Sequence, residues 1–311
     1  MSADIPGNNA VAPIDPNPAP GLPPVLPPSG RHIVQMFLVP GFIVAAVVLV
    51  LLFFNWLQSG HGDATSIIAN LDAANADVRW RAANDLTQRL KRDEELATSP
   101  QLSLRLCELL QKRLEEYDQA QKSAKDGSAD SRKELDERCK DVQFLVACVG
   151  NLMLPTGSEL LGKVLNREGD NENKQRVLLR REAVWAMSNL GNNLTRLAEL
   201  PEARRAAVLG GLQTEAASGT SDRRHWAGIA VEYLQAIQEC KQAPTHGVVD
   251  ALASAAADNG PNSDLFLREL VAHALNFWHG DDREEKLIDA TLVKLSRDAG
   301  EGQYIQVEEK D

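Results

Sequence analysis

The side chains that could carry out chemistry are few and lie scattered along the chain. The four cysteines show no CxxC spacing, and Cys139 and Cys148, nine residues apart, would lie on opposite faces of one helix. His273 and His279 are six residues apart, whereas two histidines that bind a metal from one helix are four apart. No HExxH motif, glycine-rich phosphate loop or nucleophile elbow occurs. We therefore expect no catalytic residue, no metal, no cofactor and no enzymatic activity.

One helical pattern recurs along the chain and determines the expected fold. Its clearest copy runs from Leu179 to Gly191, with apolar or small residues at offsets 0, 4, 7, 8 and 11. Two more copies start at Arg223 and Leu267, so that three starts follow at intervals of 44 residues. At 100° per residue these offsets share one side of a helix, and each copy predicts a helix with one buried stripe. A fixed period of this size is typical of stacked repeat proteins.

Two weaker copies start at Val78 and at Asp141, and the second is degenerate because its first residue is polar. A shorter amphipathic run precedes each copy, and prolines open several of these runs, as they do in the first turn of a helix. The repeating unit is therefore helix, turn, helix. A last helix through Leu287 and Leu292 closes the array. No long alternation with period two suggests a sheet.

The copies resemble HEAT repeats, particularly the short bacterial form related to the phycobilisome-lyase type. The resemblance rests on the pattern Val-Arg-x-x-Ala-Ala from Val78 to Ala83 and on the ending from Met187 to Gly191, and it covers roughly residues 62–299. It implies an all-α, right-handed α–α superhelix. In that family an arginine at offset 1 commonly forms a ladder with acidic residues of the preceding turns, and four copies carry it: Arg79, Arg180, Arg224 and Arg268. No residues specific to the pigment lyases can be matched, so that activity is not carried over.

An uncharged apolar run from Met36 to Phe54 predicts a membrane anchor. Its 19 residues would span about 28 Å as a helix, close to the roughly 30 Å of a bilayer core, and Trp56 follows as an interfacial aromatic. A cleaved signal peptide is the alternative, but no small-x-small site follows Phe54. We expect a single transmembrane helix over residues 32–58. Arg31 precedes it and acidic residues follow it, which predicts a single-pass membrane protein with a cytoplasmic tail and a repeat domain outside.

The remaining segments are polar or rich in proline. Nine of the 15 prolines lie in the first 30 residues, and residues 1–31 are expected to be a disordered tail. The stretch from Pro18 to Pro24 could dock an aromatic groove, although a solvated tail is the simpler interpretation. Residues 119–140 are expected to form a solvated loop or a polar extension of the preceding helix, with a binding insertion as the alternative. Residues 300–311 are expected to be a disordered tail, which leaves the HEAT-like domain at 62–299.

A surface for a partner follows from the same helical wheel. Offsets 2, 6 and 9 point away from the buried stripe, and second helices of HEAT-like units usually line the concave side. The candidate partner-binding residues are Trp80, Arg181, Trp185, His225, Ile229 and His273. Large apolar residues in an exposed row can mark an interaction site, while the alternative is that they fill gaps between units.

The expected function is that of a membrane-anchored scaffold for protein–protein interaction, with unidentified protein partners. The net charge of −11 over 311 residues argues against nucleic acid as a partner. Two alternatives stay open. The chain could be a ligand-holding or enzyme-accessory subunit of lyase-like type, or a structural tether of an envelope layer.

Overall fold

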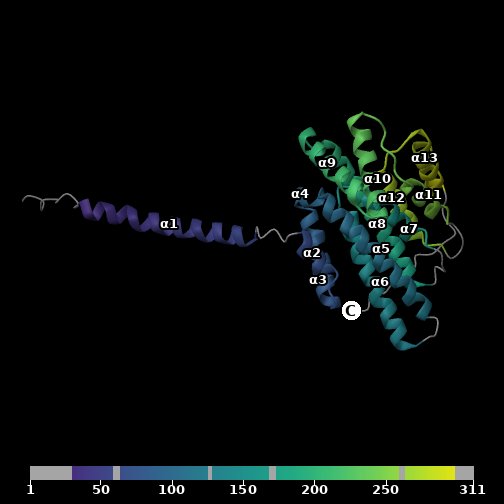
Figure 1. Cartoon of the computed structure of the whole chain (residues 1–311), viewed down its shortest axis with the longest axis horizontal. Helices are drawn as coiled ribbons and strands as arrows, with labels where there is room; N and C mark the ends of the chain where they lie inside the picture. The colour runs from purple at the N-terminus through teal and green to yellow at the C-terminus, as the bar shows by residue number, and fades with distance from the viewer. Residues whose placement is uncertain (1–29, 59–63, 125–127, 168–172, 259–262, 298–311) are drawn as a thin grey trace, which may run out of the picture. The chain divides into compact units, whose positions relative to one another are not determined.

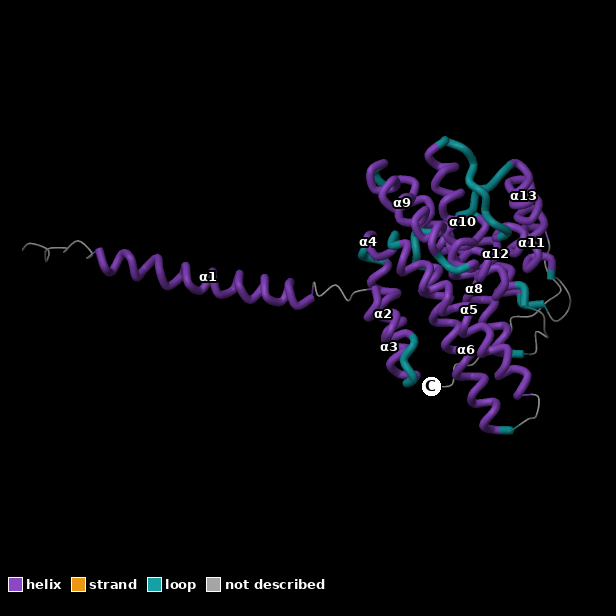
Figure 2. Tube along the Cα trace, in the orientation of Figure 1, coloured by secondary structure: helices purple, strands orange, loops and turns teal. Residues whose placement is uncertain are grey.

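The computed structural model describes residues 30–58, 64–124, 128–167, 173–258 and 263–297. The chain divides into two units, residues 1–61 and residues 62–311. The elements in the described ranges are helices (Figures 1 and 2). The tails expected at residues 1–31 and 300–311 lie outside the described residues, apart from the first two residues of α1.

Helix α1 (Gly30–Gln58) occupies the position expected for the membrane anchor. Among the described residues, however, no helix has both the length and the apolar character that crossing a membrane requires. The predicted transmembrane helix over residues 32–58 is therefore wrong, and so is the single-pass location with the tail cytoplasmic and the domain outside.

The second unit consists of helices packed against one another, which confirms the all-α part of the expected fold and is compatible with an α-solenoid. The helix bounds are α2 (Ala64–Leu71), α3 (Ala76–Leu90), α4 (Glu94–Ala97), α5 (Pro100–Ser123), α6 (Ala129–Gly150), α7 (Ser158–Leu165), α8 (Lys174–Glu199), α9 (Glu202–Ser218), α10 (Ser221–Gln238), α11 (Val248–Ala257), α12 (Leu265–Leu275) and α13 (Asp282–Arg297), with the 3-10 turn η2 (Pro155–Gly157) before α7.

The helices form two rows. Helices α3, α6, α8 and α12 pack side by side in that order, and we call them the front row. Helices α2, α5, α7, α11 and α13 form the back row, and the pairs α2–α3, α5–α6, α7–α8 and α11–α12 join the two rows. The buried leucines, valines and alanines between the rows form one continuous core. The helix-turn-helix unit predicted from the sequence is present four times.

The fourth of the five predicted units does not stack with the others. Helix α10, which carries the copy that starts at Arg223, packs on α9, α5 and η2 instead of lying between α8 and α12. The buried side chains of α10 include Trp226 and Ile229, which lie outside the predicted buried stripe. The buried side of the helix is therefore rotated toward α9, α5 and η2. The hairpin of α9 and α10 thus covers the back row, and the regular spacing of 44 residues does not correspond to regular stacking.

Close backbone contacts hold α6, α8 and α12 together. A Cβ atom at Gly150 would lie 2.5 Å from the Cα of Ala186 in α8, and one at Gly191 would lie 2.9 Å from the carbonyl oxygen of Phe277 after α12. The indole Nε1 of Trp278 donates a 3.0 Å hydrogen bond to the carbonyl of Met187 at the same junction. The glycine that ends the predicted repeat at Gly191 is required because no side chain fits between these helices.

A buried ion pair joins the first two helices of the front row. Arg79 donates from Nε and Nη2 to the carboxylate of Asp141, at 2.9 and 2.8 Å, and both side chains are about nine-tenths buried. Its Nη1 also donates to the carbonyls of Ala73 and Ala74 in the turn after α2. The polar first residue that made the Asp141 copy look degenerate is therefore the partner of the arginine in the preceding copy.

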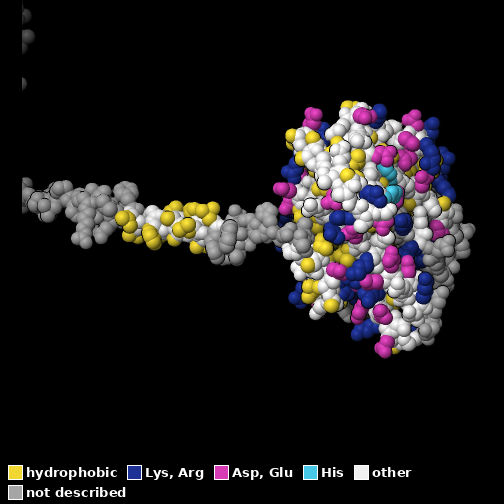
Figure 3. Space-filling view, viewed as in Figure 1, with side chains coloured by type: hydrophobic (Ala, Val, Ile, Leu, Met, Phe, Trp, Pro, Cys, Tyr) yellow, Lys and Arg dark blue, Asp and Glu magenta, His cyan; other side chains and the backbone are white. Residues whose placement is uncertain are grey.

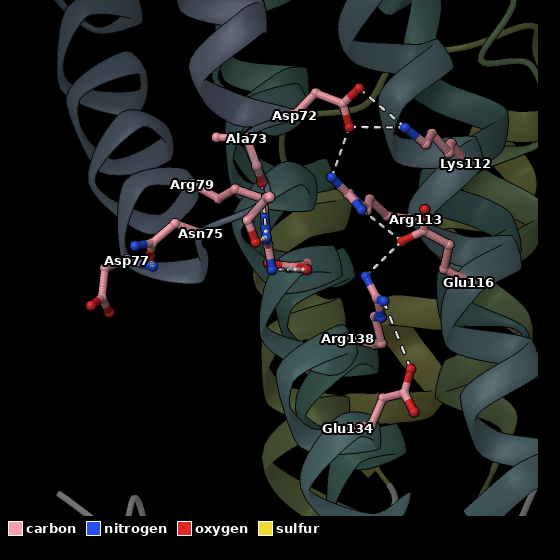
Figure 4. A network of polar contacts seen from close by, with 12 residues as sticks. Asp72, Ala73, Asn75, Asp77, Arg79, Lys112, Arg113, Glu116, Glu134 and Arg138 are labelled. Atoms are coloured by element: carbon pink, nitrogen blue, oxygen red, sulfur yellow. Dashed lines mark hydrogen bonds and ion pairs between the residues drawn. The ribbon is translucent and has the colours of Figure 1, made fainter.

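A chain of ion pairs continues from this turn across α5 to α6 (Figure 4). The carboxylate of Asp72 accepts from Lys112 and from Arg113, at 2.9 and 2.8 Å, and Arg113 reaches on to Glu116 at 2.6 Å. Glu116 is shared with Arg138 of α6 at 2.9 Å. Within residues 119–140, α5 runs on to Ser123 and α6 begins at Ala129, which agrees with the expected polar extension of the preceding helix and adds the start of a second one.

The expected arginine ladder is formed only in part. Arg79, Arg180 and Arg268 are buried in the front row, and Arg180 donates to the carbonyl of Leu165 and pairs with Asp258. Arg224 is exposed on α10, because that helix is not part of the row. The acidic partner of Arg79 lies in the next helix of the row rather than in a preceding turn.

We expect Arg79→Ala to lower the free energy of unfolding by about 3–5 kcal/mol, because it leaves the Asp141 carboxylate buried without its partner. Urea denaturation of the full chain measures the loss. Arg89→Ala is the matched control, since Arg89 forms an exposed i,i+4 pair with Asp85 and its removal should cost no more than about 0.5 kcal/mol. Equal losses of unfolding free energy in the two variants would contradict the assignment of Arg79 and Asp141 as a buried, matched ion pair.

Candidate protein-binding surface

The side of the front row that faces away from the core carries a set of aromatic side chains and the half-buried carboxylate of Glu182. We call it the outer face and define it by Trp80, Phe144, Glu182, Trp185, His273 and Phe277. Trp80 and Trp185 keep 45% and 47% of their surface exposed, and His273 is exposed as well. The sequence placed these three residues outward correctly, whereas their role in binding remains a prediction.

Three rings, from α8, α12 and the turn after α12, form one aromatic stack. The ring of Trp185 lies nearly parallel to that of His273, with centroids 6.1 Å apart, and Phe277 meets His273 edge-on at 5.1 Å. The stack lies beside the Gly191 junction, where Phe277 and Trp278 touch α8. Because the junction fixes the distance between the two helices, it also fixes the rings in a preformed surface.

Arg181 links α8 to the start of α12 and is not a free contact residue. It donates from Nε and Nη2 to both carboxylate oxygens of Asp264, each at 2.7 Å, and its guanidinium lies 4.9 Å from the ring centre of Phe266. Asp264 occupies the N-cap position of α12 but bonds to Arg181 in place of the helix N–H groups. Arg181 therefore positions the edge of the outer face.

The two candidate residues of α10 do not belong to the outer face. Ile229 is only 4% exposed and packs in the core, so its predicted outward position is wrong. His225 is exposed, but its Nε2 lies 2.8 Å from a carboxylate oxygen of Glu159 in α7. Both corrections have one cause, which is that α10 packs on the back row.

A second aromatic pair lies on the other half of the outer face. Trp80 of α3 meets Phe144 of α6 with ring centroids 6.4 Å apart and a tilt of 55°. Phe144 is half-buried and packs against the core. The outer face thus presents one aromatic pair on α3 and α6 and a triple stack on α8, α12 and the turn after α12.

Glu182 lies on α8 between these two aromatic groups. It is one helical turn from Trp185, and it is close enough to Cys148 of α6 to add to the rise in that thiol's pKa, which burial causes in the main. Burial also raises the pKa of the Glu182 carboxyl itself above its ordinary value. Glu182 is therefore a half-buried carboxylate beside the aromatic side chains of the outer face.

The sequence contained a signal for the residues that the helical wheel missed. Phe144, Glu182 and Leu270 all stand at offset 3 of their copies. At this position a side chain is directed toward the preceding helix of the row, as the contact between Phe144 and Trp80 shows. A comparison of the copies at this offset would have identified Glu182, because two of the other three front-row helices are apolar there and the third has Arg81.

A separate open groove of about 500 Å³ lies among α2, α5, α9 and α10. Its apolar floor includes Ile68 and Leu102. Its charged residues are bound to one another or to close neighbours, since Arg223 pairs with Glu215 at 3.2 Å and Asp72 with Lys112 and Arg113. The groove therefore offers a ligand little charge that is not already neutralised.

The buried thiols are not suited to nucleophilic chemistry. Burial raises the pKa of Cys107, Cys139 and Cys148 to about 12 in each case, so these thiols stay protonated at neutral pH. Over the described ranges, no three histidine, cysteine or acidic residues lie close enough together to hold a metal ion.

Comparison of the chain with known protein families, with curated proteins and with solved structures found no match to any of them.

Alanine substitutions should separate outer-face residues from core residues. Ile229→Ala removes a side chain that is 4% exposed and should cost about 3 kcal/mol, whereas Trp185→Ala removes a half-exposed ring and should cost only about 1 kcal/mol. Thermal and urea unfolding of both variants give the comparison. A larger loss for Trp185→Ala would mean that this ring serves mainly to pack the row.

Glu182→Gln should stabilise the fold at neutral pH. The folded state raises the pKa of this carboxyl above the unfolded value of 4.5, so the folded chain binds the proton more tightly, and stability falls as the pH rises through the window between the two values. The neutral amide avoids this loss. We expect a higher Tm for the variant at pH 7 and equal Tm values below the unfolded pKa; a constant difference at every pH would contradict the role of ionisation.

Proposed function

We propose that this chain is a helical scaffold that binds a protein partner on the outer face of the front row. The supporting observation is the pair of exposed tryptophans, Trp80 and Trp185, each held by ring contacts with the next helix of the row. Tryptophan is the residue most enriched among interface anchors, and rigid rings lose little conformational entropy on binding. Exposed tryptophans on the first and third helices of one row, α3 and α8, are an arrangement that a partner segment running across the row would contact.

The packing of four helix pairs in two rows supports a solenoid of HEAT-like type as the architecture of this scaffold. We propose it as an architecture only, with the α9–α10 hairpin as an insertion between its third and fourth units. Such arrays present extended surfaces for other proteins, because each unit adds one helix to the same face.

The same observations favour binding over catalysis and over nucleic acid. The three buried cysteines have thiols held neutral by burial, which supports a role without covalent chemistry. On the side of the domain seen in Figure 3, basic and acidic side chains are interspersed, and the net charge is −11. A protein that binds nucleic acid by its phosphates needs a basic stripe instead.

Photo-crosslinking tests this proposal with a matched control. Benzoylphenylalanine at Asn276, which is exposed beside Phe277, should crosslink the full chain to a protein in the cells that produce it. The same group at the exposed Gln213 of α9, outside the front row, should not. Adding Trp185→Ala should lower the yield from Asn276 at least about fivefold with a small change in Tm.

Two results would contradict the proposed function. One is a crosslinking yield that is equal from the two positions. The other is a yield from Asn276 that does not change when Trp185 is replaced.

A further inference from the structure

The outer face has one polar feature that a purely apolar partner would leave unsatisfied. Glu182 is half-buried on α8, which lies in the row between α6, the helix of Phe144, and α12, the helix of His273. In the part of the chain that the structure describes, no side chain forms a hydrogen bond or ion pair with it. Arg181 is the basic residue nearest to Glu182 in sequence, and it donates from Nε and Nη2 to the two carboxylate oxygens of Asp264.

The repeat shows that this carboxylate is not needed for packing. Phe144 in α6 and Leu270 in α12 occupy the same repeat position and pack against the core. An apolar side chain at residue 182 would therefore fit the architecture of the row and avoid the cost of partly burying a charge. Residues that oppose stability in this way are typical of functional positions.

We propose that the outer face takes a partner segment that carries a lysine or arginine, with its cationic group on the Glu182 carboxylate and its hydrocarbon stem on the ring of Trp185. This inference rests on the proposed function and adds the chemistry of the partner. Trp185 and Glu182 lie one turn apart on α8, so one long basic side chain reaches both. The indole ring packs against the hydrocarbon stem and also attracts the nearby positive charge. The Glu182 carboxylate accepts charge-assisted hydrogen bonds from the cationic group. The net charge of −11 favours the same partner by attracting basic segments over distance.

The test uses an array of 12-residue peptides in matched pairs. One member of each pair contains lysine and arginine between apolar residues, and in its twin each lysine is acetylated and each arginine is replaced by citrulline, which removes the charge at nearly constant shape. The array is probed with the purified full chain, and the best pairs are measured in solution by fluorescence anisotropy. We expect the charged members to bind at least about tenfold more tightly than their twins.

Three variants connect that preference to the site. Glu182→Gln should reduce the preference for the charged member to less than about twofold while the Tm stays equal or rises, so loss of folding cannot account for the result. Trp185→Ala should weaken binding of both members. Glu202→Gln, at an exposed carboxylate in α9 outside the row, is the control and should leave the preference unchanged.

The outcomes separate this inference from the proposed function. Peptides that bind through Trp185 with no preference for charge, or a preference that survives Glu182→Gln, would overturn the basic anchor and leave the scaffold in place. If no peptide binds and no protein crosslinks at Asn276, the scaffold itself is refuted.

Discussion

The arrangement of the domain depends on the contact between α8 and α12 at Gly191. A side chain at this position would collide with the backbone of Phe277, so the two helices can approach only because residue 191 has none. That approach places Trp185 against His273, brings Asp264 within reach of Arg181 and leaves no room for α10 in the row. The same contact thus excludes one predicted repeat and creates the aromatic stack of the outer face.

Charged side chains have two different tasks in this molecule. Arg79 and Asp141 are deeply buried and fully matched, so they define which helix lies beside which, and the chain from Asp72 to Arg138 does the same along α5 and α6 (Figure 4). Such pairs add specificity of packing more than stability. Glu182 differs from all of them because the domain partly buries its charge without a matching one.

The sequence was sufficient to predict the helices, their buried stripes and the outward position of Trp80, Trp185 and His273. Periodicity reports which side of a helix is apolar, but it does not report which neighbour covers that side. This is why Ile229 was assigned outward and why the copy at Arg223 was counted as a stacked unit. The anchor over residues 32–58 was inferred from the composition of one apolar run, but among the described residues no helix has both the length and the apolar character to cross a membrane. Glu182 stands at offset 3, at the edge of the buried stripe, so its outward position does not follow from the offsets that point directly away from the core.

The insertion of α9 and α10 has a consequence for the way in which the domain folds. In an uninterrupted array each helix meets its row neighbour after one repeat, whereas α8 meets α12 only after a hairpin has been made between them. Closing a loop of roughly twice the length adds only about 0.6 kcal/mol to the entropic cost, so the finished structure is hardly weakened. The greater sequence separation acts on the rate instead, because contacts between distant residues form slowly. The α7–α8 pair and the hairpin depend on local contacts, whereas the surface at Trp185 depends on a contact with His273 that joins distant parts of the sequence.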